Sequence, residues 1–339
     1  MTHLTFLEAG VVGLIQGVTE LFPVSSLGHN VLLPALIGGS WAKDLSVARP
    51  ESPYLAFIVG LHVATAIALL IYFWRDWIRI IGGFVSSLWQ FFSPAPGTAR
   101  WQLRTTDERL AWMIIFATIP VGLVGLVFEH AFRVIFGKPI FAAVFLVLNG
   151  LILIAGERYR RRSSVEADQK IAAARELAVS GATRSGVGRH AAGHQVIRNA
   201  EVAQAVAADR RLSAVGYGEA VIIGSAQILA LLAGISRDGV TMVAGMYRGL
   251  SREDAARFAF LLATPVILAA GVLKFPDLLG PKGDGIRGQI LFGSVLSGVG
   301  AYLSVRFLVR YFQSRTLTPY GVYCLIAGIA SIAYLGLFG

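Results

Sequence analysis

Residues 13–29 read Gly-Leu-Ile-Gln-Gly-Val-Thr-Glu-Leu-Phe-Pro-Val-Ser-Ser-Leu-Gly-His and carry ionisable side chains within a strongly apolar region. An acidic side chain at membrane depth costs about 2.5–3.5 kcal/mol on insertion scales, so it is seldom kept there without a use. Gln16 and Glu20 are four residues apart and are predicted to share one helix face. Pro23 is predicted to end that helix, and Gly28 to free the backbone before His29. The stretch therefore predicts a bent segment that gathers a carboxylate, two hydroxyls and an imidazole, as an active site would.

The composition places the chain in a membrane. Hydrophobic residues make up 55% and charged residues only 15% of the sequence, and the mean hydropathy is +0.65. The apolar residues form long blocks, which predicts an integral membrane protein of several spans. The formal net charge of +10 does not indicate nucleic acid, because the basic residues flank apolar spans or lie in one polar stretch. Cys324 is the single cysteine, which excludes a disulfide within the chain and a cysteine-based metal site.

The same order of apolar segments occurs twice. In the first half, short apolar pieces at 7–22 and 30–37 surround the Pro/Gly break and predict a re-entrant hairpin. In the second half, a short pair at 218–233 and 239–247 is broken at Gly234. Full spans are predicted at 54–74, 110–128 and 139–156 in the first half, and at 254–273, 288–309 and 319–338 in the second.

The predicted fold is an all-α integral membrane protein of two inverted repeats, each a re-entrant helical hairpin followed by three transmembrane helices. The repeats cover residues 1–156 and 218–339, joined by a polar, basic, partly disordered linker at 157–217 with short helices near 166–179 and 199–211. A hairpin returns to its own side, so each half crosses an odd number of times and the halves are inverted. With the linker in the cytoplasm, most of the 30 Lys and Arg residues fall on that side, which places both termini outside.

The second break, at residues 233–241, reads Ala-Gly-Ile-Ser-Arg-Asp-Gly-Val-Thr and complements the first. Arg237 lies in an apolar region, and glycines such as Gly239 free backbone N–H groups at a new helix start. A guanidinium beside exposed amides is suited to a phosphate. Ser236 and Thr241 add hydroxyl donors. The first break thus supplies nucleophile and base candidates, the second supplies anion binding, and together they predict phosphoryl chemistry.

The same residues also have structural interpretations. An isolated Glu20 would bond backbone groups freed at the break, and Arg237 would neutralise the neighbouring Asp238. Serines in membrane helices often bond the carbonyl one turn back. All of these residues occur at the two breaks of a duplicated architecture, which favours a shared site. His62 and Thr65, one turn apart in a full span, are weaker candidates for lining a cavity, against a packing role.

Residues 17–29 and 234–241 resemble the two signature motifs of the undecaprenyl-diphosphate phosphatase (bacitracin-resistance) family, and residues 61–65 resemble a third family segment. The similarity covers nearly the whole chain except the linker. The resemblance implies an inner-membrane enzyme that hydrolyses the C55 isoprenyl diphosphate, undecaprenyl diphosphate, and recycles the lipid carrier for cell-wall synthesis. It also implies two re-entrant hairpins and dependence on a divalent cation, Mg²⁺ or Ca²⁺.

Several positions depart from the commonest family pattern. Gln16 stands where a second glutamate is frequent, and Leu27 replaces a usual Thr or Ser. Ala233 replaces a proline, and Asp238 replaces the serine after the motif arginine. We hypothesise that Asp238 restores the negative charge absent at position 16 and helps Glu20 to hold the cation.

The motifs predict roles for two groups of residues. Catalytic roles are predicted for Glu20, Ser26, His29 and Arg237, and substrate-binding roles for Gln16, Ser25, Ser236, Gly239 and Thr241. Ser26 or a water molecule would attack the terminal phosphorus. His29 or Glu20 would take the proton. The sequence leaves both alternatives open.

Other functions compete with hydrolysis. A transporter or flippase for a lipid phosphate suits inverted repeats and broken helices equally well, whereas a purely structural scaffold gives no reason for ionisable residues at the breaks. The other membrane lipid phosphatases also use Ser-Gly-His and Ser-Arg motifs but need a histidine soon after the arginine, and none follows Arg237 within residues 238–245. The expected partner is the diphosphate lipid in the bilayer, with a homodimer left open and no nucleic acid.

Overall fold

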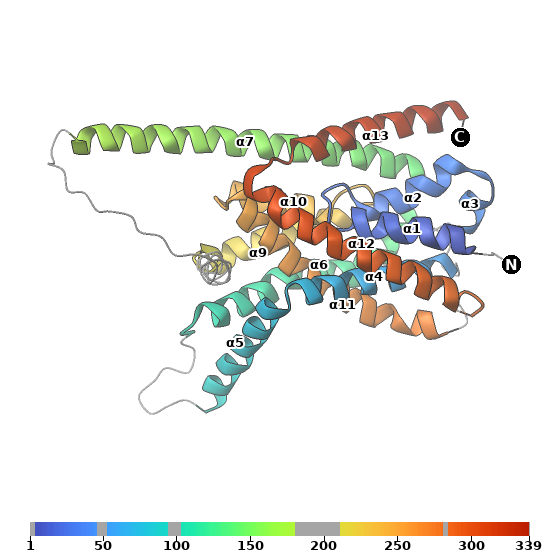
Figure 1. Cartoon of the computed structure of the whole chain (residues 1–339), viewed down its shortest axis with the longest axis horizontal. Helices are drawn as coiled ribbons and strands as arrows, with labels where there is room; N and C mark the ends of the chain where they lie inside the picture. The colour runs from blue at the N-terminus through green and yellow to red at the C-terminus, as the bar shows by residue number, and fades with distance from the viewer. Residues whose placement is uncertain (1–3, 46–52, 94–102, 180–210, 281–283, 339) are drawn as a thin grey trace, which may run out of the picture.

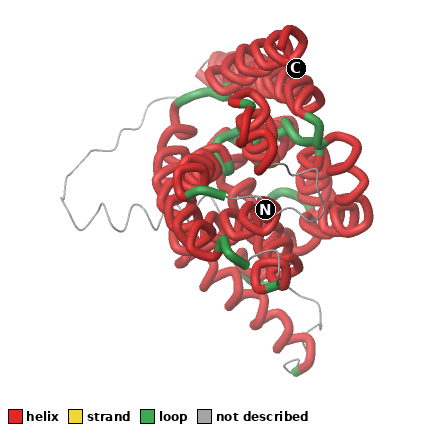
Figure 2. The backbone as a smooth tube through the Cα atoms, turned by 90° about the vertical axis from the view of Figure 1, so that its right-hand side faces the viewer, coloured by secondary structure: helices red, strands yellow, loops and turns green. Residues whose placement is uncertain are grey.

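Helices account for the architecture of the described chain. The structure is a computed structural model that describes residues 4–45, 53–93, 103–179, 211–280 and 284–338. Figures 1 and 2 show helices running side by side as an elongated bundle, with no strand among these residues. Within them, five helices are long and apolar enough to cross a membrane, and the number is six where a bent pair of helices is counted as one span. The chain is therefore a multi-pass membrane protein, as the composition predicts.

The first half opens with two short apolar helices in place of one full span. These are α1 (Phe6–Thr19) and α2 (Ser26–Ile37). At about 1.5 Å per residue, neither reaches the roughly 30 Å of a bilayer core. The half continues with α3 (Gly39–Asp44), α4 (Pro53–Tyr72), α5 (Trp74–Phe92), α6 (Thr106–Phe136) and α7 (Pro139–Val179).

The second half repeats this order of short and long elements. A broken short pair is formed by α9 (Tyr217–Ser225), the 3₁₀ helix η1 (Ala226–Leu231) and α10 (Arg237–Tyr247). The long helices that follow are α11 (Arg252–Leu279), α12 (Arg287–Ser314) and α13 (Thr318–Phe338). Each of the six predicted spans falls on one of the long helices, α4, α6, α7, α11, α12 or α13.

Two boundaries differ from the sequence prediction. The span predicted at 54–74 ends earlier, because α4 stops at Tyr72 and a separate helix, α5 (Trp74–Phe92), bends away from it by 85°. No helix end separates residue 156 from residue 157, because α7 runs on through Val179 and projects beyond the start of α13 (Figure 1). The predicted linker helix at 166–179 is thus the continuation of a membrane span. Most of the second predicted linker helix, at 199–211, lies outside the described residues.

The backbone strain of the first break also falls on a different residue than predicted. Ser25 has a φ of 70°, whereas Gly28 lies in the first turn of α2. Glycine is required at position 28 for space, because a Cβ there would lie 2.8 Å from the Cα of Gly234. The two breaks, distant in sequence, therefore touch through their backbones.

Glycines also seat the hairpins against long helices. A methyl group on Gly13 or Gly17 of α1 would collide with the carbonyl oxygens of Gly293 and Ser297 of α12. In the second half, a methyl on Gly224 of α9 would collide with the backbone of α6. Small residues spaced by four let helix backbones approach closely in a membrane. Each hairpin is thus held against a helix of the other half.

Candidate active site

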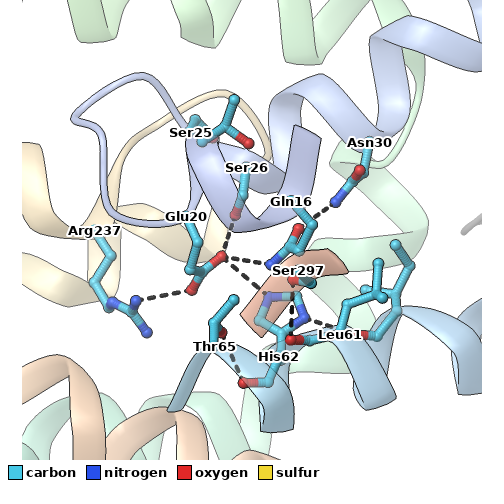
Figure 3. A network of polar contacts seen from close by, with 12 residues as sticks. Gln16, Glu20, Ser25, Ser26, Asn30, Leu61, His62, Thr65, Arg237 and Ser297 are labelled. Atoms are coloured by element: carbon cyan, nitrogen blue, oxygen red, sulfur yellow. Dashed lines mark hydrogen bonds and ion pairs between the residues drawn. The ribbon is translucent and has the colours of Figure 1, made fainter. Parts of the chain in front are cut away.

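Glu20 is the centre of the polar network in Figure 3. It lies at the C-terminal end of α1 and is 7% exposed. One carboxylate oxygen, Oε2, accepts hydrogen bonds from the Ser26 hydroxyl and from the Gln16 amide, the latter at 2.7 Å. The other oxygen, Oε1, accepts from the Arg237 guanidinium at 2.8 Å. Glu20 of the first break and Arg237 of the second, both predicted as site residues, are therefore in direct contact.

His62 of α4 is the other ionisable neighbour of Glu20. Its Nε2 lies 3.5 Å from Glu20 Oε2. Its Nδ1 is 2.8 Å from the carbonyl oxygen of Ile58, and a carbonyl only accepts, so Nδ1 carries a proton. Nε2 is then the ring nitrogen that faces the carboxylate. Thr65 supports this turn by donating to the His62 carbonyl at 2.7 Å. The sequence ranked His62 and Thr65 below the break residues, and the structure brings His62 to the carboxylate.

Gln16 supports Glu20 from a fully buried position. Its amide nitrogen donates to Glu20, and its oxygen accepts from the Asn30 amide at 2.5 Å. Both Gln16 and Asn30 are 0% exposed. The Asn30 bond fixes the orientation of the Gln16 amide, so that its donor faces the carboxylate. Gln16 therefore holds Glu20 in place. Both ends of the Gln16 amide are bonded to protein side chains, Glu20 and Asn30.

The second break presents Arg237 at the first turn of α10. Ser236 caps this helix, because its hydroxyl accepts from the Gly239 N–H at 3.1 Å. Thr241 donates to the Arg237 carbonyl at 2.7 Å. The Arg237 Nε lies 3.4 Å from Asp238 Oδ1. The serine and threonine hydroxyls thus fix the helix start, and the guanidinium is the group that reaches the first break.

Two further contacts lock the breaks together. Ser25 Oγ accepts from the backbone N–H of Gly28 and of Gly234, each at 3.2 Å. Asn149 of α7 donates to the Pro23 carbonyl and accepts from the Ser236 N–H, each at 3.0 Å. Asn149 is 0% exposed. Asn149 is not among the site residues predicted from the sequence, although a lone asparagine within the apolar 139–156 span indicates a polar contact inside the bundle.

His29 does not join this network. Its Nδ1 is 2.7 Å from the Ser25 carbonyl oxygen, and its Nε2 is 2.7 Å from the Tyr323 hydroxyl of α13. The two rings are also stacked, with centroids 5.8 Å apart. Neither nitrogen is bonded to Glu20 or Arg237 in the described structure. The side chain of His29 points along α2 toward α13, so the geometry supports Glu20 as the proton acceptor of the two alternatives.

The residues present do not form a protein-held cation site. Among the described residues, no three His, Cys, Asp or Glu side chains gather within metal-binding reach. Glu20 and Asp238 are both bonded by the guanidinium of Arg237, which supplies the positive charge that a shared cation would supply. Asp238 Oδ2 is buried with no hydrogen-bond partner among the described residues. It is a single oxygen ligand, and one ligand does not make a coordination site. No step below is routed through a metal.

The chemistry of the site follows from its partners and exposure. A serine hydroxyl bonded to a carboxylate is an activated nucleophile or a water-positioning group. A guanidinium has five N–H donors, and only some are used by Glu20 and Asp238, so others are free for phosphate oxygens. The side chains of Arg237 and His62 are 14% and 27% exposed, whereas Gln16 and Asn30 are sealed. Arg237, His62 and the half-buried Ser26 are thus the partly exposed groups of the network.

Comparison with known proteins decides the family. The model of the family described as bacitracin resistance protein BacA matches residues 9–330. The chain belongs to the BacA family. An undecaprenyl-diphosphatase of Mycolicibacterium paratuberculosis is 57% identical over 335 residues, 99% of each chain. An undecaprenyl-diphosphatase 2 of Frankia alni is 54% identical over 345 residues, covering 97% of each chain. One of Chromobacterium violaceum is 37% identical over 333 residues, covering 97% of this chain and 98% of its own.

Proposed function

We propose that this BacA-family protein hydrolyses the phosphoanhydride of undecaprenyl diphosphate, giving undecaprenyl phosphate and inorganic phosphate, and so returns the lipid carrier to peptidoglycan synthesis. The observation that carries this proposal is the contact of Ser26 and Arg237 with the same carboxylate, Glu20. The names and full-length coverage of the relatives support the substrate. A site at membrane depth suits a substrate whose prenyl tail stays in the lipid.

In the first of two routes, Ser26 is the nucleophile. Its Oγ bonds to the terminal phosphorus while its proton passes to Glu20, and the anhydride P–O bond breaks with its electrons on the departing undecaprenyl phosphate. A water molecule then attacks the phosphorus, Oγ leaves and regains the proton held by Glu20, and Glu20 takes a proton from the water as phosphate is released. In the second route, water attacks directly, Glu20 accepts its proton, and Ser26 orients the water. Arg237 stabilises the charge on the phosphoryl oxygens in both routes.

Rapid-quench labelling separates the routes. Wild-type protein mixed with substrate labelled on the terminal phosphate forms an acid-stable phosphoserine only in the first route. The Ser26→Ala variant is the control that removes the acceptor. An unlabelled wild-type protein during steady turnover assigns the reaction to water.

Phosphate release from C55 and shorter prenyl diphosphates by purified protein tests the proposed function itself. Glu20→Gln and Arg237→Gln should each lower kcat by about 10²–10⁴, the range of a lost base or charge stabiliser. Lys43→Gln, on exposed α3, is the control and should keep wild-type activity. Binding of the lipid with no phosphate release would assign the chain to transport.

A divalent cation remains a second proposal, made from the family resemblance. Mg²⁺ commonly binds one or two carboxylates together with substrate phosphates, and Glu20 is the carboxylate in reach of such a complex. EDTA should then abolish phosphate release, and Mg²⁺ or Ca²⁺ should restore it. The Asp238→Ser variant should need a higher concentration of Mg²⁺ or Ca²⁺ for activation, and an unchanged concentration would reject a role of Asp238 in holding the cation. Full activity in EDTA overturns the metal requirement and leaves the Ser26–Glu20–Arg237 chemistry standing.

We also infer that the two halves are inverted repeats with both termini outside. Reciprocal packing supports this, because α1 seats on α12 and α9 seats on α6. So do the matching caps: Ser25 bonds Gly28 and Ser236 bonds Gly239 at the two breaks. Single cysteines at Ser40 and Ser314 test the orientation with an impermeant maleimide on intact cells, because native Cys324 is buried. Ser40→Cys should label and Ser314→Cys should not, and the reverse pattern refutes the assignment.

A further inference from the structure

A shallow, open basic hollow of about 420 Å³ lies on one face of the last turns of α12, and all of its lining residues belong to α12 or to the residue that ends it. Three arginines, Arg306, Arg310 and Arg315, line it together with the aromatic rings of Phe307 and Tyr311. All three arginines are exposed. We call this hollow the α12 arginine pocket. It takes no part in the Glu20 network.

The arginines of this pocket have no acid partner among the described residues, unlike three buried or half-buried arginines of the membrane region. Within the described residues, none of the three forms a salt bridge or a side-chain hydrogen bond. By contrast, Arg237, Arg252 and Arg257 each bond a buried or half-buried carboxylate. Three unneutralised guanidinium groups around one hollow favour an anion, and guanidinium matches phosphate oxygens in geometry.

The depth of the pocket indicates where that anion comes from. The 28 residues of α12 span about 42 Å at 1.5 Å per residue, which exceeds a bilayer core of about 30 Å. The final turns of α12 therefore reach the headgroup layer, where lipid phosphates lie. Clusters of arginines at the end of a membrane helix attract the anionic headgroups of lipids at this level. Aromatic side chains such as Phe307 and Tyr311 also prefer this interface.

The pocket is separate from the active site but adjoins the turn that carries it. Gly17, three residues before Glu20, packs on Ser297, and Arg310 is about 20 Å further along α12 at 1.5 Å per residue. Phe307 stacks on Phe22 of the first break at 5.9 Å between ring centroids. One aromatic ring of the pocket thus contacts Phe22, the residue that follows Glu20 by two positions.

We propose that the α12 arginine pocket binds the phosphate of an anionic membrane lipid, apart from the diphosphate substrate. The phosphate contacts the three guanidinium groups, and the adjoining glycerol and acyl chains lie against Phe307 and Tyr311. The occupant is a lipid and not a free phosphate, because the pocket combines cationic side chains with exposed apolar surface at the level of the headgroups.

Native mass spectrometry and thermal unfolding of the full-length protein test this proposal. The probes are phosphatidylglycerol, phosphatidylcholine, inorganic phosphate and diphosphate. The pocket variant is R306Q/R310Q/R315Q, and its matched control is R158Q/R162Q/R248Q, which removes the same charge from exposed positions elsewhere. Wild type and control should retain phosphatidylglycerol at least about tenfold better than the pocket variant. Phosphate release should stay near wild type in both, which shows that each variant folds.

Three results overturn the proposal. Equal loss of phosphatidylglycerol in the control assigns binding to net charge. Equal retention of phosphatidylcholine excludes recognition of the anion. Protection by inorganic phosphate or diphosphate at the same level as the lipid assigns the pocket to a free anion. If the triple variant does not fold, Arg310→Gln against Arg158→Gln gives the same comparison with a smaller expected loss, about threefold or more.

Discussion

At the scale of single residues, Glu20 joins the groups that the proposed reaction uses. Its two oxygens take hydrogen bonds from a nucleophile candidate, a guanidinium and a buried amide. Burying a carboxylate is tolerable only when its lone pairs are satisfied and an opposite charge is near. Glu20 meets both conditions through residues from three helices. This explains how an acid is kept inside an apolar bundle in a reactive geometry.

The two histidines give a residue-scale prediction. His62→Asn should lower kcat by about 10- to 100-fold, because it removes the imidazole that lies 3.5 Å from the Glu20 carboxylate. His29→Asn should change kcat by less than about threefold, because its bonds to Ser25 and Tyr323 hold α2 and not the carboxylate. Phosphate release over a range of substrate concentrations checks both variants. A larger loss in His29→Asn than in His62→Asn would return the base role to His29.

At the scale of elements, the two broken helical pairs work as one unit because side chains bridge their loops. Asn149 is the main bridge, since it bonds a carbonyl of the first break and an N–H of the second. Ser25 adds a second link. The loops themselves have no regular backbone pairing with each other. The distance between Ser26 and Arg237 therefore depends on these few bonds.

Asn149→Ala should lower kcat by about 10- to 100-fold with a smaller change in KM. The variant leaves the Ser236 N–H and the Pro23 carbonyl without partners, at a cost of about 1–3 kcal/mol. It also loosens the reacting groups, and misplacement by about 1 Å can cost 10²-fold in rate. Ser331→Ala is the control, because that buried hydroxyl bonds only its own helix. A fall in thermal stability with kcat unchanged would limit Asn149 to a structural role.

Helix packing gives a second prediction at this scale. Gly17→Ala should destabilise the protein by about 1–3 kcal/mol, because the added methyl overpacks the contact between α1 and α12. Activity should fall with stability, since α1 carries Glu20. Gly82→Ala on α5 is the matched control, as a Cβ there meets no atom within 4 Å. Thermal unfolding in detergent compares the two, and an equal effect would show that backbone propensity and not packing is responsible.

At the scale of the whole molecule, buried ion pairs tie the long helices together at one end of the bundle. Glu157 of α7 accepts from Arg252 of α11 at 2.5 and 2.9 Å and from the Leu317 N–H, just before α13, at 3.3 Å. Its side chain is only 1% exposed. The predicted end of the first repeat is therefore a junction of three helices.

Glu157→Gln should lower the free energy of unfolding by about 3 kcal/mol, because it leaves the Arg252 charge without its partner in a mostly buried position. Asp284→Asn is the control, since the Asp284–Arg287 pair is more than 60% exposed on both sides and such pairs contribute about 0–1 kcal/mol. Chemical or thermal unfolding measures both. Equal stability of the two variants would show that the junction is not held by this charge pair.

The sequence by itself determined the membrane class, the order of short and long helices, and the presence of the reactive groups at two breaks. Hydropathy, Pro/Gly placement and the cost of burying charge act locally, so they can be read along the chain. Only the tertiary structure decided that His62 and not His29 faces Glu20, that Asn149 bridges the breaks, and that Arg237 takes the place between Glu20 and Asp238. These contacts join residues far apart in the chain, and their geometry depends on how the helices pack and rotate against each other.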